Sequence, residues 1–355
     1  MSATALQRQI LARAARVVEY RGVETAALYD DVEAEWYALD SGAGLVDLSY
    51  LTDIVATGDE RIEFLQGQVS QDLSTLGDGG GAPALALSAQ GKVEAMMALY
   101  DGGDGASLEI VVDRRAAAAA RARLEQFLVA DDVEFEDGPV RDHLGVVGPR
   151  AADLLREAGC ELVPSDPWQA GTCELAGSPV TLRARGELRV PCVEIAASDA
   201  APIWELLESK GAVPAGVEAQ EIVRVESGTP LGSVDVDDTR IAVEARLEWA
   251  IHFAKGCYVG QEVIERAVSR GRLNREIALL GAASQPSPGD SVRDGSDRDV
   301  VTSVVRSPAL GWICLAYLPR DHAEPGSEVA LVGSSGSELA ATVLDWPRSR
   351  ALPGR

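Results

Sequence analysis

Along most of the chain, apolar positions alternate between helical and strand spacing. In "DERIEFLQGQVSQDL", Ile62, Leu65 and Val69 recur at helical spacing and predict a helix. The next stretch, "GDGGGAPALALSAQGKVEAMMALYDGG", predicts two strands around a turn at Gln90 and Gly91, with glycine-rich loops outside them. A strand, helix, strand order follows in "EIVVDRRAAAAARARLEQFLVADDVEFED", where the alanine block has high helix propensity.

The same alternation continues through the middle of the chain. The segment "HLGVVGPRAADLLREAG" predicts a strand and then a helix that is closed by Gly159. Two further helices are predicted in "APIWELLESKGAVPAG" and "EAQEIVRVESGTP", and each ends at a glycine. Because strands and helices alternate irregularly, the pattern favours an α+β fold class over a doubly wound parallel sheet.

After about residue 275 the pattern changes to short β-rich segments separated by turn residues, such as "REIALLG", "VVTSVVRSP" and "WICLAYLP". These segments predict a small separate β-barrel over residues 275–355. Residues 1–274 then form an α+β region, which divides into two subdomains at about 45–140 and 141–240. A chain of 355 residues exceeds the comfortable size of one hydrophobic core, so more than one domain is expected.

Acidic residues dominate the charge of the protein. The formal net charge of -24 is spread along the whole length, and arginine supplies nearly all of the positive charge. This pattern is typical of proteins from a halophile, in which surface carboxylates maintain solvation at high salt. An acidic surface that meets a basic partner is the alternative. No cluster of Lys and Arg is present to replace the counterions of a nucleic-acid backbone, so DNA and RNA are not expected as the main ligand.

The remaining composition predicts a cytoplasmic protein. No run of about 18 apolar residues occurs, so no membrane span is expected. The opening stretch is amphipathic and interrupted by arginines, unlike a signal region. The cysteines are odd in number and include no C-x-x-C pair, so their spacing indicates neither a zinc knuckle nor a disulfide framework. A reducing compartment fits them best.

Familiar catalytic and metal-binding motifs are missing from the sequence. His143, His252 and His322 lie far apart and form no H-x-x-x-H or H-E-x-x-H set, so no metal site is expected. No G-x-S-x-G elbow is present either, which leaves a Ser-His-Asp hydrolase unsupported.

Candidate chemistry is concentrated in "AKGCYVGQEV", where Cys257 lies next to a glycine and two residues after Lys255. The following "GQEVIERAV" has the composition of a helix, whose amino-terminal end carries partial positive charge. That helix end and Lys255 would both favour the thiolate of Cys257 if they face the sulfur. A small buried cysteine that only fills space is the other interpretation, and the sequence leaves both open.

The segment "KGCYVGQE", residues 255–262, resembles the signature of the YgfZ-type folate-binding proteins. These are relatives of the glycine-cleavage T-protein (aminomethyltransferase) that assist iron-sulfur cluster assembly and tRNA modification. Residues 43–73 are similar to the family's opening block, 216–236 to its helix-turn block, and 300–318 to the strand pair of its carboxy-terminal barrel. The resemblance covers most of the chain and implies an α+β region that encloses a tetrahydrofolate pocket, followed by the barrel.

The resemblance also implies specific ligand contacts. In the T-protein relatives a glutamate accepts the two adjacent N–H donors of the pterin edge, and a gap-free alignment of "RVPCVEI" places Glu194 at that position. The arginine of the family's folate-contacting triplet corresponds to Gln220 here. Arg224 lies one helical turn further on and is the expected substitute.

Two departures from the T-protein pattern bear on catalysis. The T-proteins carry an aspartate beside the reacting folate nitrogen, in a block that resembles "GGILDD", and here Ala95 and Met96 stand in place of its two acids. Their K-x-D-F-x-G segment retains Lys255 but has Cys257 where the acid stood. Without these carboxylates, transfer chemistry of the T-protein kind loses its expected electrostatic support.

These features predict a tetrahydrofolate-binding accessory protein of the YgfZ type that acts in iron-sulfur cluster assembly or repair. Cys257, assisted by Lys255, is expected at the rim of the folate pocket, where it makes transient contact with sulfur, iron or a partner. The alternative is a tetrahydrofolate-dependent aminomethyl or methyl transferase in which other groups replace the missing aspartate. A third hypothesis is an interaction scaffold that keeps only the fold. The expected partners are folate and iron-sulfur assembly or client proteins, without a membrane or nucleic acid.

Overall fold

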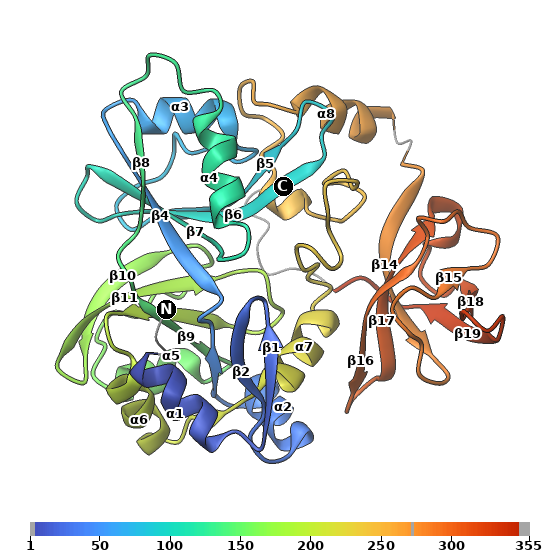
Figure 1. Cartoon of the computed structure of the whole chain (residues 1–355), viewed down its shortest axis with the longest axis horizontal. Helices are drawn as coiled ribbons and strands as arrows, with labels where there is room; N and C mark the ends of the chain where they lie inside the picture. Colours follow the sequence, from blue (N-terminus) through green and yellow to red (C-terminus); the bar gives the residue numbers. More distant parts are fainter. Residues whose placement is uncertain (1–3, 271–272, 348–355) are drawn as a thin grey trace.

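The chain folds into three lobes, each built around one β-sheet, as Figure 1 shows. The structure is a computed structural model that describes residues 4–270 and 273–347. Two lobes from the earlier part of the chain lie on the left of Figure 1, and the lobe from the end of the chain lies on the right. Helices and strands are mixed in the first two lobes, in agreement with the predicted α+β class.

The first lobe contains one antiparallel sheet and two helices. Its elements are β4 (Leu51–Thr57), α3 (Arg61–Gln68), β5 (Gly81–Leu87), β6 (Val93–Asp101), β7 (Ser107–Asp113), α4 (Ala117–Glu125) and β8 (Glu134–Asp137). The strand order is β5-β6-β7-β4-β8. Leu65 of α3 and Leu124 of α4 are buried in one core with Ile54 and Ile110 of the sheet. The helical spacing and the alanine block therefore predicted both helices correctly.

The second lobe contains a six-stranded sheet and three helices. Its elements are α1 (Ala5–Arg13), β3 (Gly44–Asp47), β9 (Asp142–Val147), α5 (Ala151–Glu157), β10 (Ala170–Leu175), β11 (Ser178–Arg185), β12 (Cys192–Ala197), α6 (Ala201–Ser209) and β13 (Val213–Pro214). The order is β10-β11-β12-β9-β3-β13, and the short β13 is parallel to β3. Ile10, Leu155 and Trp204, one from each helix, are buried in one core with Leu144 and Ile195 of the sheet.

A separate β-hairpin and two helices complete this half of the molecule. They are β1 (Arg16–Tyr20), β2 (Val23–Leu28), α2 (Val32–Ser41) and α7 (Val217–Glu226). Arg21 and Gly22 form the hairpin turn with φ of 51° and 81°, as a two-residue turn with both residues in the left-handed region requires. The hairpin contacts α1 and α7 through β2. In Figure 1, α7 lies between the second lobe and the third.

The third lobe is a six-stranded sheet that follows a short helical segment. Before this sheet, η1 (Glu248–Ala250) and α8 (Gln261–Arg270) lie beside the first lobe, where η1 contacts β5. The elements of the third lobe are β14 (Arg275–Ala282), β15 (Ser291–Val292), β16 (Val301–Ser307), β17 (Gly311–Pro319), η2 (Arg320–His322), β18 (Glu328–Val332) and β19 (Glu338–Val343). The sheet order is β15-β18-β19-β14-β17-β16. Among the described residues no strand ladder joins β15 to β16 at the two ends of this order, and Ser291 and Val300 form an isolated bridge there. The lobe is therefore a half-barrel sheet, and the predicted closed barrel is not shown.

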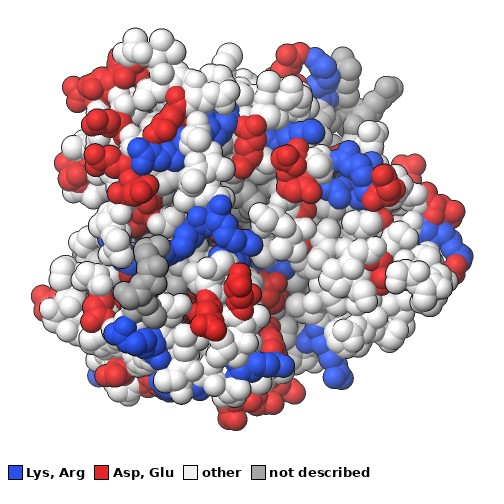
Figure 2. All heavy atoms as spheres, in the orientation of Figure 1, with Lys and Arg blue, Asp and Glu red and all other residues white. Residues whose placement is uncertain are grey.

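The structure also bears on the predictions for the cysteines and for membrane spans. Cys160 and Cys173 form a disulfide, which their spacing had not indicated, because one follows α5 and the other lies on β10. Cys192, Cys257 and Cys314 are free. Within residues 4–270 and 273–347, no helix is both long and apolar enough to cross a membrane. On the face shown in Figure 2, acidic side chains are spread over all three lobes with basic side chains between them.

Candidate functional site

A cavity of about 550 Å³ lies between the first and second lobes. This volume is in the range that suits a small organic ligand. Its walls come from β3, β4 and β6, the connection between β11 and β12, helix α7, the loop over residues 229–238, and the tip of the hairpin. The cavity therefore depends on segments from across the first 250 residues of the chain.

Two tryptophans form an aromatic wall of the cavity. The rings of Trp168 and Trp249 are stacked, with centroids 5.9 Å apart and an interplanar angle of 5°. Trp168 is only 5% exposed, and its indole Nε1 is buried without a hydrogen-bond partner. A buried N–H donor without an acceptor costs free energy, so a bound molecule that offers an acceptor there would stabilise the site.

Glu187 supplies a carboxylate with one oxygen available. The residue follows β11 and lines the cavity. Its Oε1 accepts a hydrogen bond of 2.6 Å from Nε of Arg185, whereas its Oε2 is buried without a partner. The Glu187 carboxylate can therefore accept a hydrogen bond from a ligand donor while Arg185 balances its charge.

Glu194 does not line the cavity, and Arg185 connects it to Glu187 on the cavity wall. The side chain is fully buried, and its Oε2 accepts from Nη1 of Arg185 at 2.9 Å. Its Oε1 lies 2.7 Å from Nη1 of Arg183 and 3.0 Å from Nδ1 of His143. Burial by itself raises the pKa of Glu194, but Arg183, His143 and Arg185 outweigh it and hold the pKa well below its usual range. Both oxygens are thus occupied, and Glu187 is the glutamate that lines the cavity.

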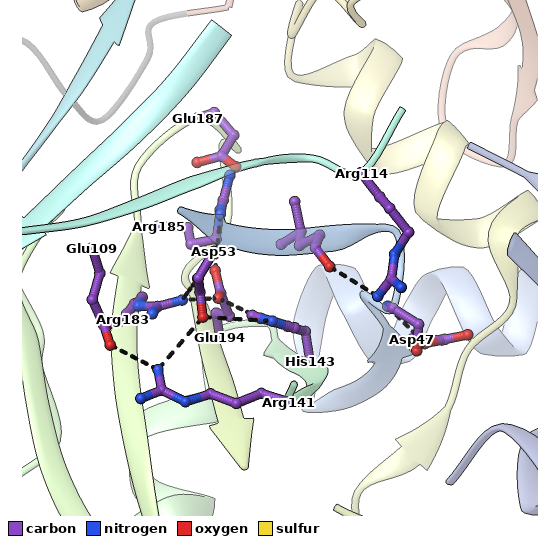
Figure 3. Close-up of polar contacts among 12 residues, drawn as sticks. Asp47, Asp53, Glu109, Arg114, Arg141, His143, Arg183, Arg185, Glu187 and Glu194 are labelled. Carbon is purple, nitrogen blue, oxygen red and sulfur yellow. Dashed lines mark hydrogen bonds and ion pairs between the residues drawn. The ribbon is translucent and has the colours of Figure 1, made fainter. Parts of the chain in front are cut away.

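Arg183 connects this pair to the other lobe. Its Nη1 lies 3.0 Å from Oδ1 of Asp53, and its Nη2 donates to Oε2 of Glu109 at 2.5 Å. Glu109 also accepts from Arg141 at 2.8 Å. Figure 3 shows Glu187 at one end of this cluster and Arg141 at the other. Because Asp53 and Glu109 come from the first sheet and Arg183 from the second, the buried ion pairs join the two lobes beneath the cavity.

Gln220 and Arg224, the two residues of α7 that the resemblance singled out, both line the cavity. Gln220 donates its side-chain amide to the carbonyl of Ala215 at 3.2 Å, which leaves the side-chain oxygen without a recorded partner among the described residues. Arg224 is fully engaged. It forms two hydrogen bonds with Glu221, at 2.8 and 2.7 Å, and one of 2.8 Å with Asp235. Arg224 therefore shapes the wall and has little capacity left for a ligand.

Lys255 and Cys257 do not line the cavity. The Lys255 ammonium donates to the backbone carbonyls of Gln66, Val69 and Gln71 at 2.7, 2.8 and 2.6 Å. Burial lowers the pKa of Lys255 to about 8. The lysine thus secures the end of α3 and the loop after it, and these three hydrogen bonds occupy the three N–H donors of its ammonium group. Cys257 is exposed on the loop before α8, which excludes the interpretation of a small buried cysteine.

The position of the missing family acid also lies on the cavity wall. Ala95 and Met96 of β6 line the cavity next to Glu94. Glu94 is paired with Arg123 at 2.6 Å. Other carboxylates line the cavity from the loop after α7. One is Asp237, whose Oδ1 accepts hydrogen bonds from the backbone N–H and the hydroxyl of Thr239. Among the described residues, no group of three or more His, Cys, Asp or Glu side chains is arranged to hold a metal ion.

Sequence reasoning missed Glu187, Trp168 and Trp249. The two tryptophans lie 81 positions apart and meet only through the fold, so no local pattern indicates their stack. Glu187 lies in the arginine-rich "LRARGELR", which is a usable signal, since a glutamate between arginines at a strand end is a candidate for a buried ion pair.

Comparisons with known proteins agree on one family. The GCVT N-terminal domain matches residues 6–255 of the chain. An aminomethyltransferase of Rubrobacter xylanophilus is 30% identical over 338 residues, which cover 92% of this chain and 90% of the relative. An aminomethyltransferase of a Nostoc species is 27% identical over 349 residues, with 95% and 93% covered.

The fold has a close match among solved structures. The glycine cleavage system aminomethyltransferase T from Bartonella henselae superimposes with a TM-score of 0.85 over 96% of each chain, at 22% identity. Together with the domain match over most of its length, this places the protein by family: the chain belongs to the glycine-cleavage T-protein (aminomethyltransferase) superfamily.

Proposed function

We propose that this protein is a tetrahydrofolate-dependent one-carbon transferase of the aminomethyltransferase type, with its folate site in the cavity between the first two lobes. The observation that carries the proposal is the Glu187 carboxylate, which lines the cavity with its Oε2 buried and unpartnered. Membership of the superfamily and the aminomethyltransferase names of its relatives supply the reaction class. This favours the transferase over the accessory role.

The residues on the wall fit a reduced folate. A pterin edge presents two adjacent N–H donors, and Glu187 offers one free carboxylate oxygen and a second that is shared with Arg185. The stacked Trp168 and Trp249 provide flat apolar surface for the ring system, and the Trp168 indole N–H can meet a ligand acceptor. When bound, tetrahydrofolate would supply the nitrogen that receives the one-carbon unit.

Transfer would have to proceed without an acid at positions 95 and 96. Ala95 and Met96 instead make this part of the wall apolar, so any carboxylate that supports the reaction comes from elsewhere on the cavity. Asp237 lines the cavity, and its hydrogen bonds with Thr239 help to hold the pKa of Asp237 below its usual range, which burial alone would raise. It is the group from which such support is expected.

One observation favours a second candidate function. Cys257 is exposed, so it is accessible to a partner in the way that a YgfZ-type accessory protein would require. In that account folate binding serves iron-sulfur cluster assembly or repair, and Cys257 makes the contact outside the cavity. The two candidates share the folate site and differ in whether a one-carbon unit is transferred.

The experiment that separates them uses the purified full chain under anaerobic conditions. Tetrahydrofolate binding is measured first by calorimetry, and the protein is then incubated with tetrahydrofolate and a thioether-linked aminomethyl donor. A one-carbon folate adduct that accumulates faster than in the protein-free control supports the transferase. Binding without any adduct above that control would reject the transferase and leave the accessory role.

A further inference from the structure

We propose that Glu194 is a positioning residue that keeps Glu187 ready to bind the ligand, and that it acts through Arg185. This inference rests on the proposed folate function of Glu187. Glu194 is fully buried and does not line the cavity, so any effect on the ligand must pass through a neighbour.

Arg185 is shared between the two glutamates. Its Nε donates to Oε1 of Glu187 at 2.6 Å, and its Nη1 donates to Oε2 of Glu194 at 2.9 Å. A guanidinium and a carboxylate prefer two parallel hydrogen bonds when nothing else competes. Glu194 binds Nη1 and so fixes the orientation of the guanidinium, in which Arg185 gives Glu187 a single hydrogen bond from Nε and Oε2 of Glu187 has no protein partner.

Glu194 can fix the orientation of Arg185 because it is itself held in place. Its other oxygen is bound by Arg183 at 2.7 Å and by His143 at 3.0 Å. Arg183 is in turn paired with Asp53 and with Glu109 of the first sheet. The ion pairs seen in Figure 3 therefore extend from a rigid contact between the two lobes to the carboxylate on the cavity wall.

Replacing Glu194 by glutamine keeps its shape but removes its charge. The Arg185 guanidinium is then free to turn, so that Nε and Nη2, the two donors of one edge, pair with both oxygens of Glu187, and Oε2 is no longer available to a ligand donor. We expect tetrahydrofolate to bind about tenfold more weakly to Glu194→Gln, as loss of one charge-assisted hydrogen bond predicts. In a Glu187→Gln background the same change has no further effect, because the group through which Glu194 acts is already gone.

Asp299→Asn is the matched control. Asp299 is buried, is paired with an arginine, Arg275, at 3.5 Å, and undergoes the same carboxylate-to-amide change, but it lies in the third lobe and does not line the cavity. We expect Asp299→Asn to lower the melting temperature and leave tetrahydrofolate affinity unchanged. Equal losses of affinity in Asp299→Asn and Glu194→Gln, or additive losses in the Glu187→Gln background, would overturn the positioning role.

Arg185→Lys tests the same connection if Glu194→Gln does not fold. A lysine cannot bridge two carboxylates as a planar fork does, so the loss of affinity should again be about tenfold alone and absent in the Glu187→Gln background. An additive effect would contradict the proposal here too. If the unmodified protein does not bind tetrahydrofolate at all, the proposed function fails instead, and this outcome is distinguishable from the others.

Discussion

Trp168 lies parallel to Trp249 across a 5.9 Å separation of ring centroids, and its indole N–H has no partner. The two residues lie far apart in the sequence, one before β10 and the other within η1. Their stack thus forms a rigid surface at the cavity and leaves one donor for a ligand.

Trp168→Phe is expected to keep most of the apolar surface but remove the Nε1 donor. Tetrahydrofolate should bind about tenfold more weakly, since one buried hydrogen bond is lost, while the free protein loses little stability because that donor has no partner to lose. Calorimetry and thermal melting measure both quantities. Unchanged affinity would show that the ligand does not use this N–H.

Lys255→Met should lower the free energy of unfolding by about 2–4 kcal/mol, because three buried carbonyl groups lose their donor. Denaturant unfolding measures the change. Lys210→Met is the control, since Lys210 is exposed and should give no measurable loss. Equal stabilities of the two variants would contradict the structural role of Lys255.

The pH dependence of stability provides a second measurement on the same group. The pKa of Lys255 is lowered to about 8 in the folded protein, from an ordinary value of 10.5. Between pH 8 and 10.5 the side chain of Lys255 is protonated in the unfolded chain and neutral in the folded protein. The contribution of Lys255 to the free energy of unfolding therefore increases as the pH rises through this range. This gain should be missing in Lys255→Met. An equal increase in the free energy of unfolding of Lys255→Met over this pH range would show that another group causes it.

Cys257 should be the free thiol that iodoacetamide alkylates fastest in the folded protein. Cys192 and Cys314 are buried, and burial raises the pKa of both thiols, that of Cys314 to about 12. Mass spectrometry after a short reaction identifies the site. Cys257→Ser is expected to bind tetrahydrofolate as the unmodified protein does, because Cys257 does not line the cavity. Weaker binding by this variant would place the thiol closer to the ligand than the structure does.

The sequence predicted the local elements well and the long-range contacts poorly. The helix at α3, the strand pair around Gln90 and the strands after Arg275 follow from spacing and turn residues, which act over a few positions. The hairpin at β1 and β2 was missed because the first four residues of β1 are exposed, so the strand carries no alternating pattern. A small β-barrel was predicted for the third lobe, where the structure has a half-barrel sheet, because spacing cannot show that β15 has only two residues.

The candidate site shows the same division. Gln220 and Arg224 both line the cavity because both lie on α7, one helical turn apart, whereas the predicted folate contact of Arg224 stays a prediction. Spacing could not show which glutamate lines the cavity, Glu187 after the end of β11 or Glu194 within β12. All six residues of β12 are buried, so the alternation that normally separates two faces gives no information there. The exposure of Cys257 likewise depends on packing that no local pattern encodes.

The most direct test of the account is the calorimetric affinity of tetrahydrofolate for the unmodified protein, for Glu187→Gln and for Glu174→Gln, an exposed carboxylate on β10 that serves as the control. The account predicts binding to the unmodified protein, unchanged binding to Glu174→Gln, and a loss of about 10- to 100-fold in Glu187→Gln without a loss of melting temperature. Equal affinity of Glu187→Gln and the unmodified protein would contradict it.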